Sequence, residues 1–140
     1  RSSAASDVYK RQAIGWGAAV EWLDRHDMKE IHSHINRIAS WTAEQISEID
    51  GITVYGDPTR GDSSGAVSFL HESIQSQDLA LLLDEGGFAV RTGHHCAQPL
   101  MDALGVPSTN RASFWLYNTM DEAEAFVEHL RYVVDRFSDK

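Results

Sequence analysis

The single cysteine of this chain, Cys96, has neighbours that can activate a thiol. His94 and His95 immediately precede it, and Arg91 lies five residues upstream. The thiolate, not the thiol, is the reactive form of cysteine, and nearby positive charge favours the thiolate. The segment from Arg91 to Leu100, with the sequence RTGHHCAQPL, therefore indicates a candidate nucleophile.

The residues on either side of Cys96 predict a strand-to-helix loop. Residues 88–91 form a short apolar run after two glycines, which is typical of a strand. Residues 99–104 have the pattern of a short helix with proline in its first turn, and Gly105 is expected to end it. Cys96 is thus expected near the positive end of a helix dipole, and this helix, together with the two histidines, would raise its thiolate fraction.

Two other roles for this cysteine follow from the residues alone. A lone cysteine is often a small buried hydrophobe, and that role stays open beside the reactive one. A metal site made of His94, His95 and Cys96 is disfavoured, because adjacent residues do not easily converge on one ion. No spaced Cys/His pairs complete a tetrahedral site, so we predict no metal.

Four segments together resemble a known family. They are Arg91–Ala97, Pro99–Met101, Arg111–Phe114 and Tyr117–Thr119. In these segments the chain resembles the C-terminal part of SufS-type cysteine desulfurases. These are the group II cysteine desulfurases and selenocysteine lyases of the class V aminotransferase family. The resemblance runs from about residue 13 to about residue 137.

The resemblance implies a reaction, a cofactor and partners. The family uses pyridoxal 5′-phosphate as an electron sink to labilise the carbon–sulfur bond of L-cysteine or L-selenocysteine. A cysteine thiolate of the enzyme takes the sulfur as a persulfide, and L-alanine is released. The sulfur then passes to a sulfur-acceptor protein for iron–sulfur cluster assembly. The full-length enzymes of the family are usually homodimers.

The resemblance also assigns roles to residues of this chain. Cys96 matches the catalytic nucleophile. Arg111 matches the arginine that grips the substrate carboxylate, a task that suits a planar guanidinium because it donates two parallel hydrogen bonds. Arg91 matches a second active-site, substrate-binding arginine. Near the site the matched segments place Gly93, His94, His95 and Asn118, although a strand-to-helix turn alone would also explain Asn118.

The lysine that holds the cofactor in this family has no counterpart here. The three lysines are Lys10, Lys29 and Lys140, and none has the surroundings expected of a cofactor lysine. We therefore expect a fragment that holds the nucleophile and the substrate clamp but does not bind pyridoxal phosphate covalently. The fragment alone is expected to be inactive.

Composition limits the class of protein and its partners. The 140 residues allow one domain with a real core. The formal net charge of −9 argues against nucleic acid or an anionic membrane as the main partner. No apolar run is long enough to span a bilayer, and one cysteine excludes an internal disulfide. These features favour a cytoplasmic protein.

The order of the elements predicts an α+β fold, a short and mostly antiparallel sheet packed with helices. We expect helices at residues 13–23, 27–49, 77–85, 99–104 and 120–137, strands at 52–55, 66–70, 88–91 and 111–117, and a loop at 59–64. This agrees with the small C-terminal domain of a pyridoxal-phosphate enzyme of fold type I, which the resemblance implies.

The resemblance divides the chain in two. Residues 1–12 do not match the family and are expected to be a non-native or disordered leader. Residues 13–140 are expected to be the C-terminal small domain, which in the family packs on a larger cofactor-binding domain upstream.

Local patterns predict how the helices begin and what they bury. Asp27 and Ser76 are expected to cap two helices, and Thr119 with Glu122 to form a capping box. The expected buried stripes are Ile31, Ile35, Ile38, Thr42, Ile46 and Ile49 in one helix, and Phe126, Val127, Leu130, Val133, Val134 and Phe137 in the last.

Three classes of function stay open. The first is the desulfurase domain, which Arg111 favours because a protein that only carries sulfur has no amino-acid carboxylate to hold. The second is a non-catalytic thiol protein that receives sulfur on Cys96 and needs no lysine. The third is a partner-docking domain in which Cys96 is buried and inert.

Overall fold

The computed structural model of this chain describes residues 3–57 and 64–138. Apart from Ser64, the loop expected at residues 59–64 lies outside the described residues. The chain forms two compact units, residues 1–33 and residues 34–140. Within the described residues, no helix combines the length and apolar character needed to cross a membrane.

The first unit holds helix α1 (Ser3–Leu23) and the beginning of α2 (Met28–Ser47). Of the expected leader at residues 1–12, residues 3–12 belong to helix α1. Asp27 caps α2 as expected, because its carboxylate accepts hydrogen bonds from the backbone N–H groups of Lys29 and Glu30 at 2.9 and 3.3 Å.

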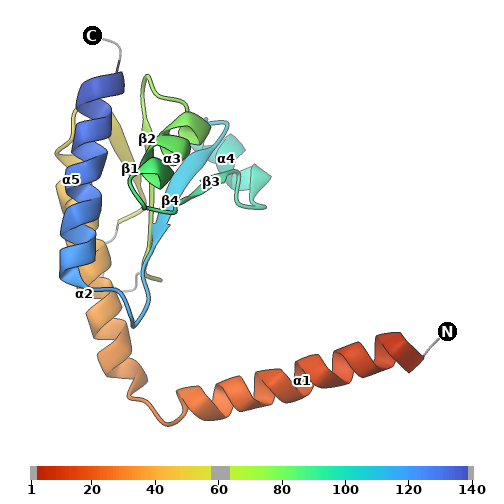
Figure 1. Cartoon of the computed structure of the whole chain (residues 1–140). Coiled ribbons are helices and arrows are strands. Elements are labelled where there is room, and N and C mark those ends of the chain that lie inside the picture. The colour runs from red at the N-terminus through yellow and green to blue at the C-terminus, as the bar shows by residue number, and fades with distance from the viewer. Residues whose placement is uncertain (1–2, 58–63, 139–140) are drawn as a thin grey trace. The chain divides into compact units, whose positions relative to one another are not determined.

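The second unit is built on a four-stranded antiparallel sheet with strand order β1-β2-β4-β3 (Figure 1). The strands are β1 (Ile52–Tyr55), β2 (Ala66–His71), β3 (Arg91–Gly93) and β4 (Thr109–Ser113). The helices that follow α2 are α3 (Ser76–Glu85), α4 (Gln98–Leu104) and α5 (Met120–Phe137). The predicted α+β class with an antiparallel sheet is confirmed.

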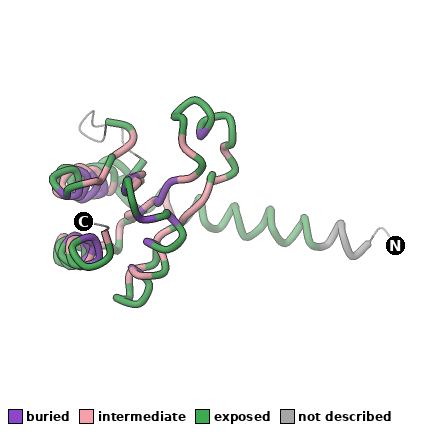
Figure 2. Tube along the Cα trace, turned by 90° about the horizontal axis from the view of Figure 1, so that it is seen from above, coloured by how far each residue is buried: buried purple, intermediate pink, exposed green. Residues whose placement is uncertain are grey.

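One face of the sheet carries the hydrophobic core. In Figure 2 the two long helices α2 and α5 are seen end-on, side by side, with buried residues toward the sheet. Arg131 of α5 donates a hydrogen bond to the Gln45 carbonyl of α2 at 3.1 Å. The core includes Ala39, Ala43, Ile46, Val67, Phe69, Leu79, Leu83, Ala112, Phe126, Val127, Leu130 and Val133. Helices α2, α3 and α5 therefore cover one face of the sheet and do not cover the other face.

The predicted buried stripes are largely confirmed, with two exceptions. Ile31 is only half-buried, since it lies in the first turn of α2. Phe137 is 47% exposed, because it is the last residue of α5 and lies beyond the core. Its ring instead lies beside the guanidinium of Arg136, 5.7 Å from the ring centroid.

Strand β3 begins later than the predicted strand at 88–91. The backbone N–H of Phe88 donates to the Leu83 carbonyl at 3.0 Å, and Gly87 adopts a positive φ of 86°. These contacts close the C-terminus of α3 in a Schellman arrangement, so residue 88 is not available to a strand ladder. The Phe88 ring packs edge-on against Phe126, with centroids 5.8 Å apart.

Strand β4 is shifted relative to the predicted strand at 111–117, since it covers residues 109–113. The chain then turns, because the Asn118 side chain accepts a hydrogen bond from the Trp115 N–H at 2.8 Å. The Asn118 N–H also donates to the Trp115 carbonyl at 3.0 Å. This turn chemistry overrides the alternation of apolar residues that predicted a longer strand.

Helix α3 lacks the predicted serine cap. Gln75 is at the N-cap position and makes no capping side-chain bond, and Ser76 is already helical. The Ser76 hydroxyl instead bonds the hydroxyl of Ser108 at 2.5 Å. Ser76 therefore links the start of α3 to the segment that leads into β4.

Candidate active site

A row of four polar side chains crosses all four strands on the face of the sheet opposite the core. Register pairs Tyr55 with Ser68, Ser68 with Arg111, and Arg111 with Arg91. Successive side chains of a strand point to opposite faces. Because Val67, Phe69 and Ala112 enter the core, this row must lie on the other face.

The two arginines of this row are direct partners on adjacent strands. Residues opposite each other in an antiparallel pair have Cβ atoms roughly 4.5–5.5 Å apart, and like charges in such positions repel. Within the described residues neither Arg91 nor Arg111 forms a salt bridge, and the buried Nε of Arg111 has no hydrogen-bond partner. The pair therefore concentrates positive charge and free donors, an arrangement that suits a carboxylate or another anion.

Cys96 lies in a tight turn between β3 and α4. The Ala97 N–H donates to the His94 carbonyl at 2.8 Å, and the two residues between them, His95 and Cys96, have φ angles of 55° and 58°. A turn with positive φ at both central positions normally contains Asn and Gly. Holding two other residues in this region costs on the order of 1–2 kcal/mol each, so other contacts must offset the strain.

The cysteine is exposed, so a buried inert thiol does not fit this structure. Its backbone N–H donates to the Nδ1 of His94 at 3.2 Å. Gly93, the last residue of β3, has a φ of 116°, a conformation that a side chain would strain. The predicted loop position of Cys96, between a strand and a helix, is confirmed.

Helix α4 fixes the other end of the loop. Pro99 lies in its first turn, and Gly105 ends it with a φ of 71°, both as predicted. Met101 is buried, so one side of this short helix is held against the rest of the unit.

His95 is bound to β4 and does not act as a positive neighbour of the thiol. Its Nε2 lies 3.1 Å from the carbonyl oxygen and 3.0 Å from the hydroxyl oxygen of Thr109. Burial lowers the pKa of His95 from its ordinary value of 6.5, and the charges of Arg111 and Arg91 lower it further. The ring is therefore neutral near pH 7, which corrects the expectation that His95 raises the thiolate fraction by its charge.

His95 and Arg111 line one pocket of about 480 Å³. Its other lining residues are Tyr55, Gly56, Ser68, Ala97, Leu100, Met101, Leu104 and Thr109. The pocket joins the cysteine turn, α4 and the polar row of the sheet. The structure thus brings together Arg91, Arg111, His94, His95 and Cys96 at one place. Tyr55, Ser68 and Thr109 join them, although no motif in the sequence pointed to these three.

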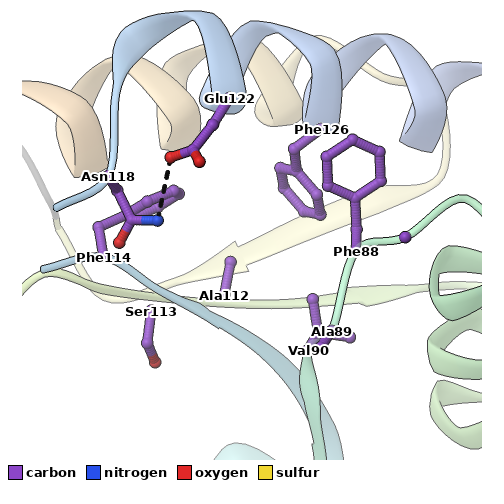
Figure 3. Close-up of a pocket in the computed structure, with 10 residues that line it drawn as sticks. Phe88, Ala89, Val90, Ala112, Ser113, Phe114, Asn118, Glu122 and Phe126 are labelled. Carbon is purple, nitrogen blue, oxygen red and sulfur yellow. Dashed lines mark hydrogen bonds between the residues drawn. The ribbon is translucent and has the colours of Figure 1, made fainter.

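Asn118 lies at a different pocket, of about 250 Å³, between α5 and the sheet (Figure 3). Its side-chain amide nitrogen donates to Glu122 at 3.3 Å, and its backbone carbonyl accepts a hydrogen bond from His34 at 2.9 Å. Phe88, Phe114 and Phe126 form much of the remaining wall. The polar atoms of Asn118 are thus committed to the turn before α5, on the core side of the sheet.

The residues of this site can bind the anionic groups of a cofactor or substrate. They cannot hold an aldehyde cofactor covalently. Arginine pairs and hydroxyls bind carboxylate and phosphate oxygens. A Schiff base requires a lysine, and residues 34–139 contain none. Among the described residues, no three His, Cys, Asp or Glu side chains converge in a way that could hold a metal ion.

Fold and site together define a small α+β domain with an exposed thiol and two paired arginines on one face of its sheet. The profile of the class-V aminotransferase family matches residues 10–126, and the chain belongs to this family.

Relatives and solved structures place the chain beside cysteine desulfurases. It is 43% identical over 125 residues to a protein of Halalkalibacterium halodurans named probable cysteine desulfurase. The match covers 89% of this chain and 30% of that relative. The structure of the cysteine desulfurase from Thermococcus onnurineus superposes with a TM-score of 0.83 at 33% identity, covering 89% of this chain and 31% of that one.

A second solved structure gives the same result. The cysteine desulfurase CsdA from Escherichia coli superposes with a TM-score of 0.81 at 32% identity, covering 88% of this chain and 30% of that one. The chain therefore spans about a third or less of the length of these relatives.

Proposed function

We propose that this chain is the C-terminal small domain of a cysteine desulfurase of the SufS type. The observation that carries the proposal is an exposed thiol in a turn whose residues His95 and Ala97 line the same pocket as Arg111, the strand partner of Arg91. The names and structures of the relatives support the same reaction. In the full-length protein the substrate would be L-cysteine or L-selenocysteine.

Arg111 would hold the carboxylate of the substrate amino acid. Arg111 lies within the polar row, paired with Ser68 on one side and with Arg91 on the other. Arg91 would add a second positive charge and further donors. The match between two planar donors and two carboxylate oxygens fixes the orientation of the substrate, which in turn fixes where its sulfur lies.

Cys96 would be the acceptor of that sulfur. Its thiolate attacks the substrate sulfur, and an S–S bond forms as the substrate C–S bond breaks. The electron pair of the broken bond stays with the substrate carbon, which takes up a proton to give alanine. Pyridoxal phosphate, on which this family generally depends, supplies the electron sink that makes the C–S bond labile.

The cofactor lysine would come from a part of the protein outside this chain. The absence of lysine from residues 34–139 supports this proposal. The isolated chain should accordingly bind no cofactor covalently and release no alanine from L-cysteine.

The exposure of Cys96 on a turn supports delivery of the persulfide sulfur to an acceptor protein, for iron–sulfur cluster assembly. We further propose a homodimeric, cytoplasmic full-length enzyme. The acidic net charge of −9 fits this location better than a nucleic-acid or anionic membrane surface.

The experiment uses the full-length protein that contains this domain, with Cys96→Ala as the variant. The wild type should release alanine from L-cysteine and carry a persulfide on Cys96, as read by mass spectrometry of the peptide. The variant should still bind the cofactor and L-cysteine, since neither step needs the thiol, but should form no persulfide. Wild-type protein without alanine release would overturn the proposal.

A sulfur carrier is the second candidate, and the same exposed thiol favours it. A carrier would accept sulfur on Cys96 from a separate donor without releasing alanine itself. It would also be indifferent to Arg111→Ala, because it has no carboxylate to hold.

A further inference from the structure

The turn that carries Cys96 needs an anchor outside itself. Two of its hydrogen bonds are internal, from the Ala97 N–H to the His94 carbonyl and from the Cys96 N–H to His94 Nδ1. Neither bond ties the turn to the sheet. Yet His95 and Cys96 both have positive φ angles, a conformation that persists only where surrounding contacts hold it.

His95 supplies contacts that reach from the turn to a strand. Its Nε2 meets both oxygens of Thr109, at 3.1 and 3.0 Å. Thr109 is only 1% exposed and is paired with Gly93 across the β3–β4 ladder. The anchor point is therefore a buried residue that is itself held in the sheet.

The chemistry of the two partners fixes the proton on the ring. A backbone carbonyl oxygen can only accept, so Nε2 must carry the proton and donate it. In the neutral ring Nδ1 is then unprotonated, and this atom is buried without a hydrogen-bond partner. Because burial also lowers the pKa of His95, the neutral form with the proton on Nε2 is the resting form near pH 7.

We propose that His95 is a positioning residue for the cysteine, whose Nε2–H anchors the strained turn to Thr109 and so fixes the direction of the Cys96 thiol. The role rests on the proposed function, because the thiol must attack a sulfur held by Arg111. His95 itself does not touch the reacting atoms. It acts through the backbone of the turn.

The anchor is tested first on the 140-residue chain. Amide hydrogen exchange of Ala97 reports the turn directly, since its N–H closes the turn on His94. His95→Leu should raise this exchange rate by about tenfold or more, because loss of the anchor lets the turn open. His95→Gln, whose amide can donate from nearly the same place, should keep most of the protection. Unchanged Ala97 exchange in His95→Leu would overturn the proposal.

A matched control is His129→Leu. His129 also donates from Nε2 to a backbone carbonyl, that of Leu82 at 3.2 Å, but far along the chain from the cysteine turn. It should change global stability and leave the relative protection of Ala97 unaltered. If His95→Leu does not fold, His95→Ala replaces it, since alanine removes the anchoring ring and keeps the strain of the positive φ.

The consequence for sulfur transfer is tested in the full-length protein. His95→Leu should slow persulfide formation by about 10–100-fold, the size expected for misplacement of a reacting group by about 1 Å. The affinity for L-cysteine should fall less than the rate, because Arg111 is untouched, and His95→Gln should restore the rate. If the wild type forms the persulfide and His95→Leu forms it at the same rate, the positioning role is refuted. The proposed function would be unaffected by that result.

Discussion

Arg91 and Arg111 lie directly opposite each other on β3 and β4, with their side chains on the face of the sheet away from the core. Two like charges in such a pair are destabilising by about 0.2–1 kcal/mol, so the fold alone gives no reason for the arrangement. The repulsion occurs next to the pocket that Arg111 and His95 line. An anion bound between the guanidinium groups would turn the repulsion into attraction.

This relationship predicts that anions stabilise the chain through the arginine pair. Sulfate, compared with chloride at equal ionic strength, should raise the melting temperature of the wild type, because an ion that binds only the folded state stabilises it. Arg91→Gln should reduce this gain to the general stabilisation that sulfate gives a folded protein. In chloride it should raise the free energy of unfolding by about 0.2–1 kcal/mol by relieving repulsion.

Arg136→Gln is the control for that experiment. Arg136 lies in the last turn of α5, away from the pair. Loss of this charge should leave the sulfate effect intact and slightly lower stability, since a basic residue favours the helix dipole there. An equal sulfate effect in Arg91→Gln and in the wild type would contradict an anion site at the pair.

The capping box at the start of α5 should stabilise the turn that ends β4. The Thr119 hydroxyl accepts from the Glu122 N–H at 3.2 Å, and the Glu122 carboxylate accepts from the Thr119 N–H at 2.9 Å. Thr119→Ala should lower the free energy of unfolding by about 1 kcal/mol. Thr119→Ser should retain most of this stabilisation, because serine also caps helices. Urea unfolding measures both, and equal midpoints for all three proteins would refute the assignment.

The capping box shows what the sequence could predict about the fold. Thr119 and Glu122 are three residues apart, so their contact depends only on local spacing. The same is true of Pro99 and Gly105 at the ends of α4 and of the buried stripe of α2. The limits of β3 and β4 were mispredicted, because Phe88 and Asn118 make turn contacts that outweigh apolar alternation.

For a related reason, the sequence predicts only some of the residues of the candidate site. Cys96, Arg91 and Arg111 lie in motifs, but Tyr55 and Ser68 join them only through strand register. Register depends on which strands pair, and the order β1-β2-β4-β3 is not a local property. The position of the proton on the His95 ring likewise depends on Thr109, which is fourteen residues away.

His95 should make the stability of the chain depend on pH. Its folded pKa is lowered chiefly by burial, with Arg111, Arg91 and His94 adding to the shift and the Thr109 hydrogen bond opposing it. Below the ordinary value of 6.5 the unfolded chain therefore binds more protons than the folded chain. The contribution of His95 is complete above that value and is lost as pH falls through the lowered folded pKa.

The measurement is urea unfolding between about pH 7.5 and about pH 5, the range in which histidine titrates. His95→Gln, which cannot titrate, should lose less stability over this range than the wild type. A His95→Gln curve parallel to that of the wild type would show that the ring is not held neutral.

Arg111 should determine the binding of L-cysteine in the full-length protein through the geometry of its guanidinium. Arg111→Ala should weaken binding by about 2–5 kcal/mol, the range for removing one partner of a buried charged pair. Arg111→Lys should not restore it, because an ammonium group keeps the charge but cannot donate two parallel hydrogen bonds to one carboxylate. Substrate titration followed in the cofactor absorbance gives the three affinities, with Cys96→Ala as the background so that no turnover interferes. Recovery of wild-type affinity in Arg111→Lys would mean that the positive charge alone suffices. It would refute the bidentate hydrogen bonding of Arg111 to the carboxylate.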